Sequence, residues 1–463
     1  MQLLRSLKSF IPERHPLRLL YHRMKGWLAA ARHGFPVRKL RTIAVTGTDG
    51  KTTTVGMITH ILRAGGRKVG AISTAFFDID GAVRWNATQK TSIAPLEFQR
   101  FLRDCRAAGC EFVVVEASSH GIVQGRLGPV QPEVAAITNT SMEHLDYHGS
   151  MDQYRKDKGR LFQWLRGRGT KVLHRDDATF EMYSTVPSEK TITYSTNGNQ
   201  GSRRSQGVQG EANFWISDVH TSPTSTSALL HASSDHRSPI TDHLILPIPG
   251  AFNLENALCA IACASAVGID MGSSVEALRT FPGVPGRLER IDEGQPFAVF
   301  VDYTVTPVAH EKTLRAVRAT APDRRLLVLT GSCGDRMREK RPHVGRIASE
   351  LSDVLVITTD ETYTEDPLTV IEEVWTGVDR TTVQAHKIPD RREAITFLLR
   401  LAQPGDAVVL CGMGCCTTMM TRRGQIPWDE RGIARAILRE MLHGGATSST
   451  VSPFCPSHAA KYR

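Results

Sequence analysis

One short segment, residues 46–54, constrains the fold more than any other part of the chain. It reads TGTDGKTTT and follows the apolar run 43–45, with a helical pattern after it. A strand, a glycine-rich turn and a helix in this order form a phosphate-binding loop, because the amides at the start of the helix point toward the anion. The usual G-x-x-x-x-G-K-[ST] spacing would need glycine at position 45, where the chain has Val45. We therefore expect a shorter type of phosphate loop. A chance Gly-Lys-Thr in a surface turn is the weaker alternative.

The apolar pattern beyond this loop is that of an α/β protein. Short apolar runs alternate with helix-period segments, which is typical of a mostly parallel sheet covered by helices. The expected strands lie at 42–45, 68–72, 112–115, 134–137 and 171–173, and again at 297–301, 325–329, 354–358 and 407–411. Between 194 and 239 the chain is rich in Ser, Gly, Thr and Gln, and the runs 212–219 and 228–232 predict an antiparallel patch there.

At 463 residues the chain is too long for one ordinary core. We expect a P-loop-containing central parallel-sheet domain at 41–284 and a Rossmann-like C-terminal α/β domain at 285–443. A basic amphipathic segment at 1–40 would precede them, and a flexible tail at 444–463 would follow. The nine cysteines are scattered without C-x-x-C pairs, which argues against a disulfide framework or a zinc ribbon. The composition predicts a cytoplasmic protein.

The net charge of +10 is concentrated at the N-terminus. Residues 1–40 hold nine Lys and Arg side chains against one acid, Glu13, and leucines are interleaved with them. Such a segment is either a helix lying on anionic lipid or a basic helical face packed on the next domain, and the sequence favours neither. Charge is the only support for nucleic-acid binding, so no nucleic-acid partner is expected.

Polar side chains follow two of the predicted strands. Glu116 comes at the end of the strand 112–115, and Asn139, His144, Asp146 and His148 follow the strand 134–137. Ligands and Mg²⁺ bind at the carboxyl ends of parallel strands, so we expect these side chains to face the phosphate loop. The alternatives are an acid that caps a turn for Glu116 and a surface or capping role for His148.

With these motifs the chain resembles the Mur ligase family, the ATP-dependent enzymes that add amino acids to the peptidoglycan precursor. The resemblance rests on the short phosphate loop and on blocks whose order and spacing hold from about residue 41 to 440. It is strongest to the members that add the third residue. The blocks are EASSH at 116–120, HLDYH at 144–148, PGAFNLEN at 249–256, PGRLE at 285–289, DY at 302–303, GDR at 334–336 and KRP at 340–342.

The resemblance implies roles for individual residues. Lys51 would bind the β and γ phosphates of ATP, and Thr52 with Glu116 would hold one Mg²⁺. His144 and a carbamylated Lys158 would support a second Mg²⁺, and Lys51, Lys158 and His144 would be the catalytic residues. The other nucleotide contacts would be Gly47, Thr48, Asp49, Gly50, Thr53, Asn253, Asn256, Arg287 and Asp302. Substrate contacts would be Thr91, Ser92, Ser118, Asn139, Asp335, Arg336 and Asp360.

The implied reaction transfers a phosphoryl group from ATP to a substrate carboxylate, and an amine then attacks the acyl phosphate. The partners would be a muramyl-peptide and an amino acid, with ATP and Mg²⁺ as cofactors and the protein acting as a monomer. Two alternatives stay open. One is a related ligase acting on another glutamyl substrate, of the folylpolyglutamate or cyanophycin type. The other is a non-catalytic ATP-binding scaffold of a cell-wall assembly.

The sequence also departs from the family pattern. Only about 40 residues precede the phosphate loop, so we expect the usual uridine-binding domain to be missing and a lipid-linked precursor to be a possible substrate. Val305 stands where relatives have histidine, and 360–363 reads DETY in place of D-N-P-R. The segment 412–416 reads GMGCC in place of G-K-G-H-E, so the family acid becomes Cys416. The added amino acid therefore stays open.

Overall fold

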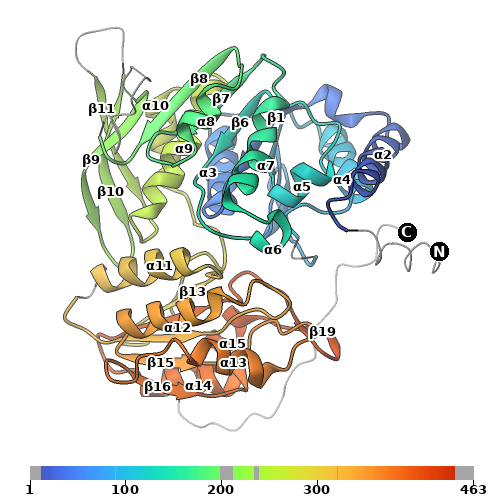
Figure 1. Cartoon of the computed structure of the whole chain (residues 1–463). Helices are drawn as coiled ribbons and strands as arrows, with labels where there is room; N and C mark the ends of the chain where they lie inside the picture. The colour runs from blue at the N-terminus through green and yellow to red at the C-terminus, as the bar shows by residue number, and fades with distance from the viewer. Residues whose placement is uncertain (1–11, 89, 199–211, 234–238, 321, 444–463) are drawn as a thin grey trace.

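The computed structural model describes residues 12–88, 90–198, 212–233, 239–320 and 322–443. The first eleven residues of the basic segment and the predicted tail at 444–463 lie outside this description. The described chain forms a larger sheet layered with helices and, below it in Figure 1, a smaller one. The predicted boundary at residue 285 falls between the last helix of the first body and the first strand of the second.

The larger sheet has eleven strands in the order β11-β10-β9-β8-β7-β6-β1-β5-β2-β3-β4. Its parallel centre consists of β1 (Arg41–Thr46), β2 (Val69–Ile72), β5 (Phe112–Glu116), β6 (Val134–Ile137), β7 (Thr170–His174) and β8 (Lys190–Ser195). β9 (Phe214–Thr221), β10 (Thr226–Ala232) and β11 (Ile240–Leu246) extend one side, and β3 (Phe76–Ile79) and β4 (Ala82–Trp85) the other. The pairs β9–β10 and β10–β11 are antiparallel, which confirms the predicted patch.

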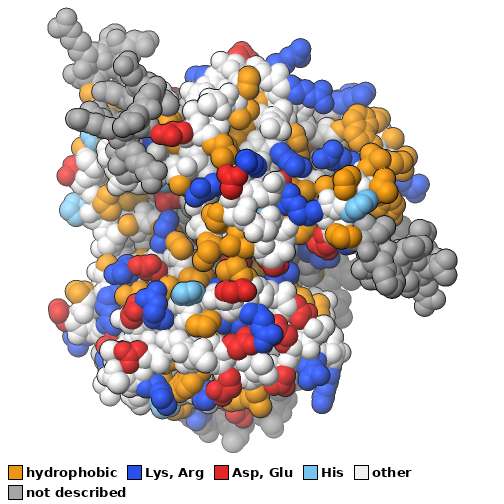
Figure 2. Space-filling model, viewed as in Figure 1, with side chains coloured by type: hydrophobic (Ala, Val, Ile, Leu, Met, Phe, Trp, Pro, Cys, Tyr) orange, Lys and Arg blue, Asp and Glu red, His pale blue; other side chains and the backbone are white. Residues whose placement is uncertain are grey.

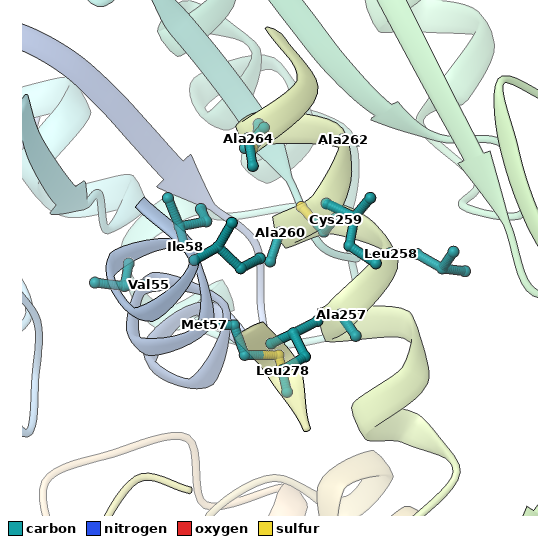
Figure 3. Packing of buried hydrophobic residues seen from close by; sticks show 14 of the residues in the cluster. Val55, Met57, Ile58, Ala257, Leu258, Cys259, Ala260, Ala262, Ala264 and Leu278 are labelled. Carbon is teal, nitrogen blue, oxygen red and sulfur yellow. The ribbon is translucent and has the colours of Figure 1, made fainter. Parts of the chain in front are cut away.

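Helices cover both faces of this sheet, and each face has its own apolar core. The first core includes α3 (Lys51–Ala64), α9 (Phe252–Ala266) and α10 (Met271–Leu278). The second includes α4 (Pro95–Ala107), α5 (Ser119–Gln124), α7 (Met151–Gln163) and α8 (Phe180–Ser184). Figure 3 shows Met57 of α3 pointing toward α9, where the small residue Ala257 and the buried Cys259 lie. Cys259 and Cys263 are fully buried, so they belong to the core.

The smaller sheet has six strands in the order β12-β13-β17-β14-β15-β16. They are β12 (Glu289–Ile291), β13 (Ala298–Asp302), β14 (Leu326–Thr330), β15 (Val354–Ile357), β16 (Gln384–Lys387) and β17 (Ala407–Cys411), and all pairs except β12–β13 are parallel. One face carries α11 (Pro307–Thr320), α12 (Lys340–Leu351) and α13 (Pro367–Trp375), and the other α14 (Arg391–Leu401) and α15 (Glu430–Leu442). A hairpin, β18 (Thr418–Thr421) and β19 (Gly424–Pro427), follows β17. The predicted fold class is confirmed.

The described part of the N-terminal segment forms the helix α2 (Pro16–Arg32) and the short 3₁₀ turn η1 (Pro36–Lys39). α2 packs on α4 and α5 through its small residues, of which Gly26, Ala29 and Ala30 are buried. α2 therefore packs on the next domain, which is one of the two arrangements that the sequence left open, but it does so through small residues and not through a basic face. Among the described residues, no helix has both the length and the apolar character that crossing a membrane requires.

Candidate active site

The phosphate loop lies between β1 and α3 in a conformation that requires its glycines. Gly50 has φ 79°, and a Cβ there would lie 2.1 Å from Asn256 Oδ1. A Cβ on Gly47 would lie 1.9 Å from Thr138 Oγ1. Both contacts are far shorter than atoms allow, so close packing as well as backbone conformation selects glycine at these two positions. The loop ends at Lys51, where the free amides of the first turn of α3 begin.

Lys51 is half-buried at the base of the loop. Its Nζ donates a hydrogen bond to the Thr48 carbonyl oxygen over 2.6 Å. Burial lowers the pKa of Lys51, opposed by the nearby carboxylates of Glu116 and Asp49. A desolvated ammonium at this place gains most from an anion that enters the loop, because the charge interaction is strong where water is excluded.

Glu116, at the carboxyl end of β5, faces the loop as predicted. Its carboxylate accepts hydrogen bonds from Thr52 Oγ1 at 2.9 Å, from the Thr74 amide at 2.8 Å and from Thr74 Oγ1 at 3.0 Å. Across the described ranges, no three His, Cys, Asp or Glu side chains are grouped as a metal site. Mg²⁺ at nucleotides takes most of its ligands from phosphate oxygens and water, so one or two protein groups suffice. Thr52 beside Glu116 fits that requirement.

A second cluster surrounds His144, which precedes the short helix α6 (Leu145–His148). The His144 and His120 rings lie 4.8 Å apart between centroids. Burial, and then the neighbouring His120 and Lys158, lower the pKa of His144 well below its usual value, so the imidazole is neutral at pH 7. A neutral imidazole is the form that binds a metal ion.

Lys158 of α7 is fully enclosed behind the phosphate loop. Its Nζ donates to the Gly47 carbonyl oxygen over 2.5 Å and lies 4.5 Å from the centroid of the Tyr154 ring. Burial and the nearby Lys51 lower the pKa of Lys158 well below its usual range. The direction of this pKa shift favours the neutral amine, the form that carbamylation needs, although Lys158 does not line the cavity described below.

Two asparagines of α9 and two residues of the C-terminal domain complete the loop surroundings. Asn256 Nδ2 donates to Asn253 Oδ1 over 3.1 Å. Arg287 Nη2 donates to Thr52 Oγ1 over 3.1 Å, so a C-terminal residue reaches the phosphate loop directly. Asp302 accepts a hydrogen bond of 2.6 Å from the Leu288 amide, and burial raises its pKa.

Further contacts join the two domains around the same space. Lys340 Nζ lies 3.4 Å from Glu143 Oε1 and donates to the Val305 carbonyl oxygen over 3.0 Å. Lys312 Nζ lies 3.3 Å from Glu255 Oε2. Each of these ion pairs has its lysine in the C-terminal domain and its acid in the central domain. The described arrangement is therefore closed, with the C-terminal domain held over the loop.

A cavity of about 990 Å³ lies between the domains. Sixteen of the predicted site residues line it: Thr48, Asp49, Gly50, Lys51, Thr52, Thr53, Thr91, Ser92, Glu116, Ser118, His144, Asn253, Asn256, Arg287, Asp302 and Arg336. Gly47, Asn139, Lys158, Asp335 and Asp360 do not line it. Asn139 lies behind the loop, where its Oδ1 accepts from the Asp49 amide at 3.0 Å. Asp335 accepts from the Thr364 amide at 3.2 Å, and Asp360 from the Glu361 amide at 2.6 Å.

Comparison with known proteins decides the family. The Mur ligase middle domain matches residues 45–264, and the Mur ligase glutamate ligase domain matches residues 286–414. The chain belongs to the Mur ligase family. It is 36% identical over 441 residues to a UDP-N-acetylmuramyl-tripeptide synthetase from Roseiflexus sp. (strain RS-1), covering 90% of this chain and 82% of the relative. The resemblance seen in the motifs is confirmed, and the chain is an ATP-dependent ligase.

Solved structures agree with this assignment. A UDP-N-acetylmuramoyl-L-alanyl-D-glutamate–2,6-diaminopimelate ligase superposes with a TM-score of 0.61 at 29% identity, covering 92% of this chain and 84% of that one. The Mycobacterium tuberculosis folylpolyglutamate synthase complexed with ADP and AMPPCP gives a TM-score of 0.66 at 15% identity, covering 91% of this chain and 95% of that one. At that identity the second likeness concerns the fold alone.

In this Mur ligase the N-terminal segment contributes to the cavity wall, which the sequence did not indicate. Pro12, Glu13 and Arg14 line the cavity. Arg14 Nη1 donates to Asp157 Oδ2 over 2.6 Å, and Asp157 also lies 2.8 Å from His148 Nδ1. Because 143 residues separate Arg14 from Asp157, only the folded structure reveals the pair.

Near Ser92 the cavity wall is polar and basic. Ser92 Oγ and Ser118 Oγ lie 2.9 Å apart. Arg126 Nη1 donates to the Ser92 carbonyl oxygen over 3.1 Å, and burial lowers the pKa of Arg126. Arg126 lies ten residues after Glu116, beyond the block 116–120, and the sequence analysis assigned it no role.

The C-terminal wall carries an acid that the sequence analysis did not assign to the cavity. Glu361 lines the cavity with Tyr363, Arg336 and Cys333. Its Oε1 accepts from the Met420 amide and its Oε2 from the Tyr363 hydroxyl, each over 3.2 Å. Burial, and then the neighbouring Asp360, raise the pKa of Glu361 to about 7.

The two adjacent cysteines lie outside the cavity lining. Cys416 is buried with Met413 and Met419 in a small apolar cluster, and Cys415 belongs to the first core of the central domain. The position where relatives carry an acid thus presents no side chain to the cavity here. Glu361 is a carboxylate of the C-terminal domain that does line the cavity.

Proposed function

We propose that this Mur ligase joins the carboxyl group of a muramyl-peptide to the amine of an amino acid, through an acyl phosphate, in peptidoglycan precursor synthesis. The observation that carries the proposal is the cavity itself. A buried phosphate loop, a polar wall around Ser92 and an acidic wall at Glu361 enclose one continuous space. Phosphate donor, carboxylate acceptor and amine would therefore meet without release of the intermediate to water.

In this proposal the phosphate loop amides and Lys51 hold the β and γ phosphates. Thr52 and Glu116 hold one Mg²⁺, and His144 with a carbamylated Lys158 supports a second. The metal ions would supply neutralisation of charge on the phosphate oxygens. Arg287 reaches Thr52 from the C-terminal domain, which supports a role for domain closure in completing the site.

We assign the nucleotide and substrate contacts from the place of each residue in the cavity wall. The proposed adenine contacts are Asn253 and Asn256, and the proposed contacts at the domain seam are Arg287 and Asp302. For the muramyl-peptide we propose Thr91, Ser92 and Ser118, joined by Arg126. Among the remaining predicted substrate residues Arg336 alone lines the cavity, so we propose indirect roles for Asn139, Asp335 and Asp360.

We further propose that the amine of the amino acid lies beside Glu361. The described residues place no Lys or Arg in an ion pair with this carboxylate, although it is largely buried, and buried charges are normally paired. An ammonium group of the incoming amino acid would supply the partner. Arg336, which lies with its guanidinium 5.2 Å from the centroid of the Tyr363 ring, would then receive a carboxylate.

We propose that the protein acts as a monomer, and the need for ATP supports a cytoplasmic location. The test is a product assay with ATP, Mg²⁺, UDP-muramyl dipeptide and a panel of amino acids, read by mass spectrometry. We expect one amino acid to be added, and Lys51→Ala to abolish the product while Lys190→Ala, at an exposed lysine, does not. Full activity of Lys51→Ala would refute the assignment. If product formed with a folate substrate and not with the muramyl-peptide, folate would replace the muramyl-peptide as the proposed substrate.

A further inference from the structure

The helix α2 exposes an unusual set of large apolar side chains. Their spacing along the helix places them on one face, and between 45% and 66% of each is accessible to solvent. In no other helix of the described chain are two or more large apolar residues so exposed. We call this set the α2 apolar face; it consists of Leu17, Leu20, Tyr21, Met24, Trp27 and Leu28.

The opposite face of α2 is fixed to the central domain. A Cβ added to Gly26 would lie 2.8 Å from the Gly125 carbonyl oxygen, so helix and loop are in close backbone contact. Ala29 and Ala30 are buried on the same side. Because α2 already packs on the central domain through its small residues, the α2 apolar face does not form part of the core of that domain.

Basic side chains surround the α2 apolar face. Arg23, Lys25 and Arg32 of α2 are exposed, and Arg38 and Lys39 of η1 follow. Arg32 of α2 and Arg100 and Arg103 of α4 are all near enough to His33 to lower its pKa, after the effect of burial. Figure 2 shows apolar side chains gathered over α2 with Lys and Arg side chains at their edge.

We propose that the α2 apolar face docks on the surface of an anionic lipid bilayer. Bulky apolar residues on one face, with Lys and Arg beside them, are the features that place a helix in the interface plane, and each base near an anionic surface adds to the attraction. A second copy of this chain would bring two basic rims together, and like charges would oppose that contact. The charge of the rim thus favours anionic lipid over self-association.

The docked helix would lie next to the active site. α2 begins at Pro16, two residues after Arg14, which lines the cavity. Docking depends only on the surface of α2 and goes beyond the proposed reaction, so it is tested by binding and not by turnover.

The experiment is flotation of the full chain with vesicles of phosphatidylcholine alone or mixed with phosphatidylglycerol. We expect flotation only with the mixed vesicles and weaker flotation in high salt. Leu20→Ser with Met24→Ser should lower the partition coefficient at least about tenfold, because two large side chains lose apolar burial. Lys25→Gln should lower it about fivefold, as expected for one base at an anionic surface.

Leu368→Ser is the matched control, since Leu368 lies on α13 and is 56% exposed, like Leu20 at 54% and Met24 at 55%. It should float as the parent does. Thermal unfolding at the parent temperature confirms that each variant is folded. Failure of the parent to float, equal flotation with both vesicle types, or equal loss in Leu368→Ser would each overturn the proposal. So would light scattering that shows a dimer dissociated by Leu20→Ser with Met24→Ser.

Discussion

Glu361 offers the sharpest test of the acceptor end of the cavity. Burial raises its pKa from 4.5 to about 7, so the folded chain favours the protonated carboxyl. Below pH 4.5 Glu361 is protonated in both the folded and the unfolded chain and costs the folded state almost no stability. As the pH rises toward 7 the free energy of unfolding falls, and above pH 7 the contribution of Glu361 to it stays constant. With a pKa of 4.5 in the unfolded chain and about 7 in the folded chain, Glu361 lowers the free energy of unfolding by about 1 kcal/mol at pH 5 and by about 3 kcal/mol at pH 8.

Glu361→Gln removes the ionisation and keeps the size of the side chain. The free energy of unfolding of the variant, relative to that of the parent, should therefore rise by on the order of 2 kcal/mol from pH 5 to pH 8. This figure allows for the part of the carboxyl that still contacts water. The assay is the difference in urea midpoint between variant and parent at the two pH values. Glu276→Gln, at a glutamate whose side chain is 78% exposed, is the control and should show the same small difference at both.

The same substitution separates stability from function. If Glu361 pairs with the ammonium group of the amino acid, Glu361→Gln should raise the KM for the amino acid and leave the KM for ATP unchanged. A variant no more stable at pH 8 than at pH 5, relative to the parent, would refute the burial argument. An unchanged KM for the amino acid would refute the pairing.

Three further substitutions test the phosphate end. Gly50→Ala should abolish ATP binding, measured by calorimetry, and destabilise the chain by at least about 1–2 kcal/mol, because its Cβ would meet Asn256 Oδ1 at 2.1 Å. Arg287→Lys should lower kcat roughly tenfold or more with an unchanged circular dichroism spectrum, because a shorter reach and fewer donors lose the bond to Thr52. Lys158→Gln, whose side chain is polar and one atom shorter but cannot be carbamylated, should make activity independent of added bicarbonate, whereas bicarbonate should stimulate the parent.

The phosphate end could be predicted from sequence because its determinants are local. The loop, the start of α3 and Glu116 are each read from a few consecutive residues, and a parallel sheet brings strand ends to one edge by construction. The strands that were predicted lie within about two residues of their observed bounds, since buried parallel strands are continuous apolar runs, whereas the parallel strands β8 and β16 were not predicted. The motifs of the family then placed residues such as Arg287 at the site.

The acceptor end could not be predicted in this way. Glu361 lines the cavity beside the hairpin after β17, whose Met420 amide donates to its carboxylate. The pair Lys340–Glu143 joins residues 197 positions apart in different domains. Neither contact leaves a local pattern in the sequence. The motif at 412–416 directed attention to Cys416, which the structure buries away from the cavity.

The N-terminal segment shows how one short element can serve two surfaces. Arg14 is hydrogen-bonded to Asp157 of α7, the helix that also carries Lys158, and α2 begins two residues later at Pro16. α2 itself is held by close backbone contact between Gly26 and the loop after α5. No long linker separates these anchors, so the α2 apolar face and the cavity wall belong to one packed body. Whatever surface α2 binds is then held at a fixed distance from the cavity, and the geometry of the site does not depend on a mobile tether.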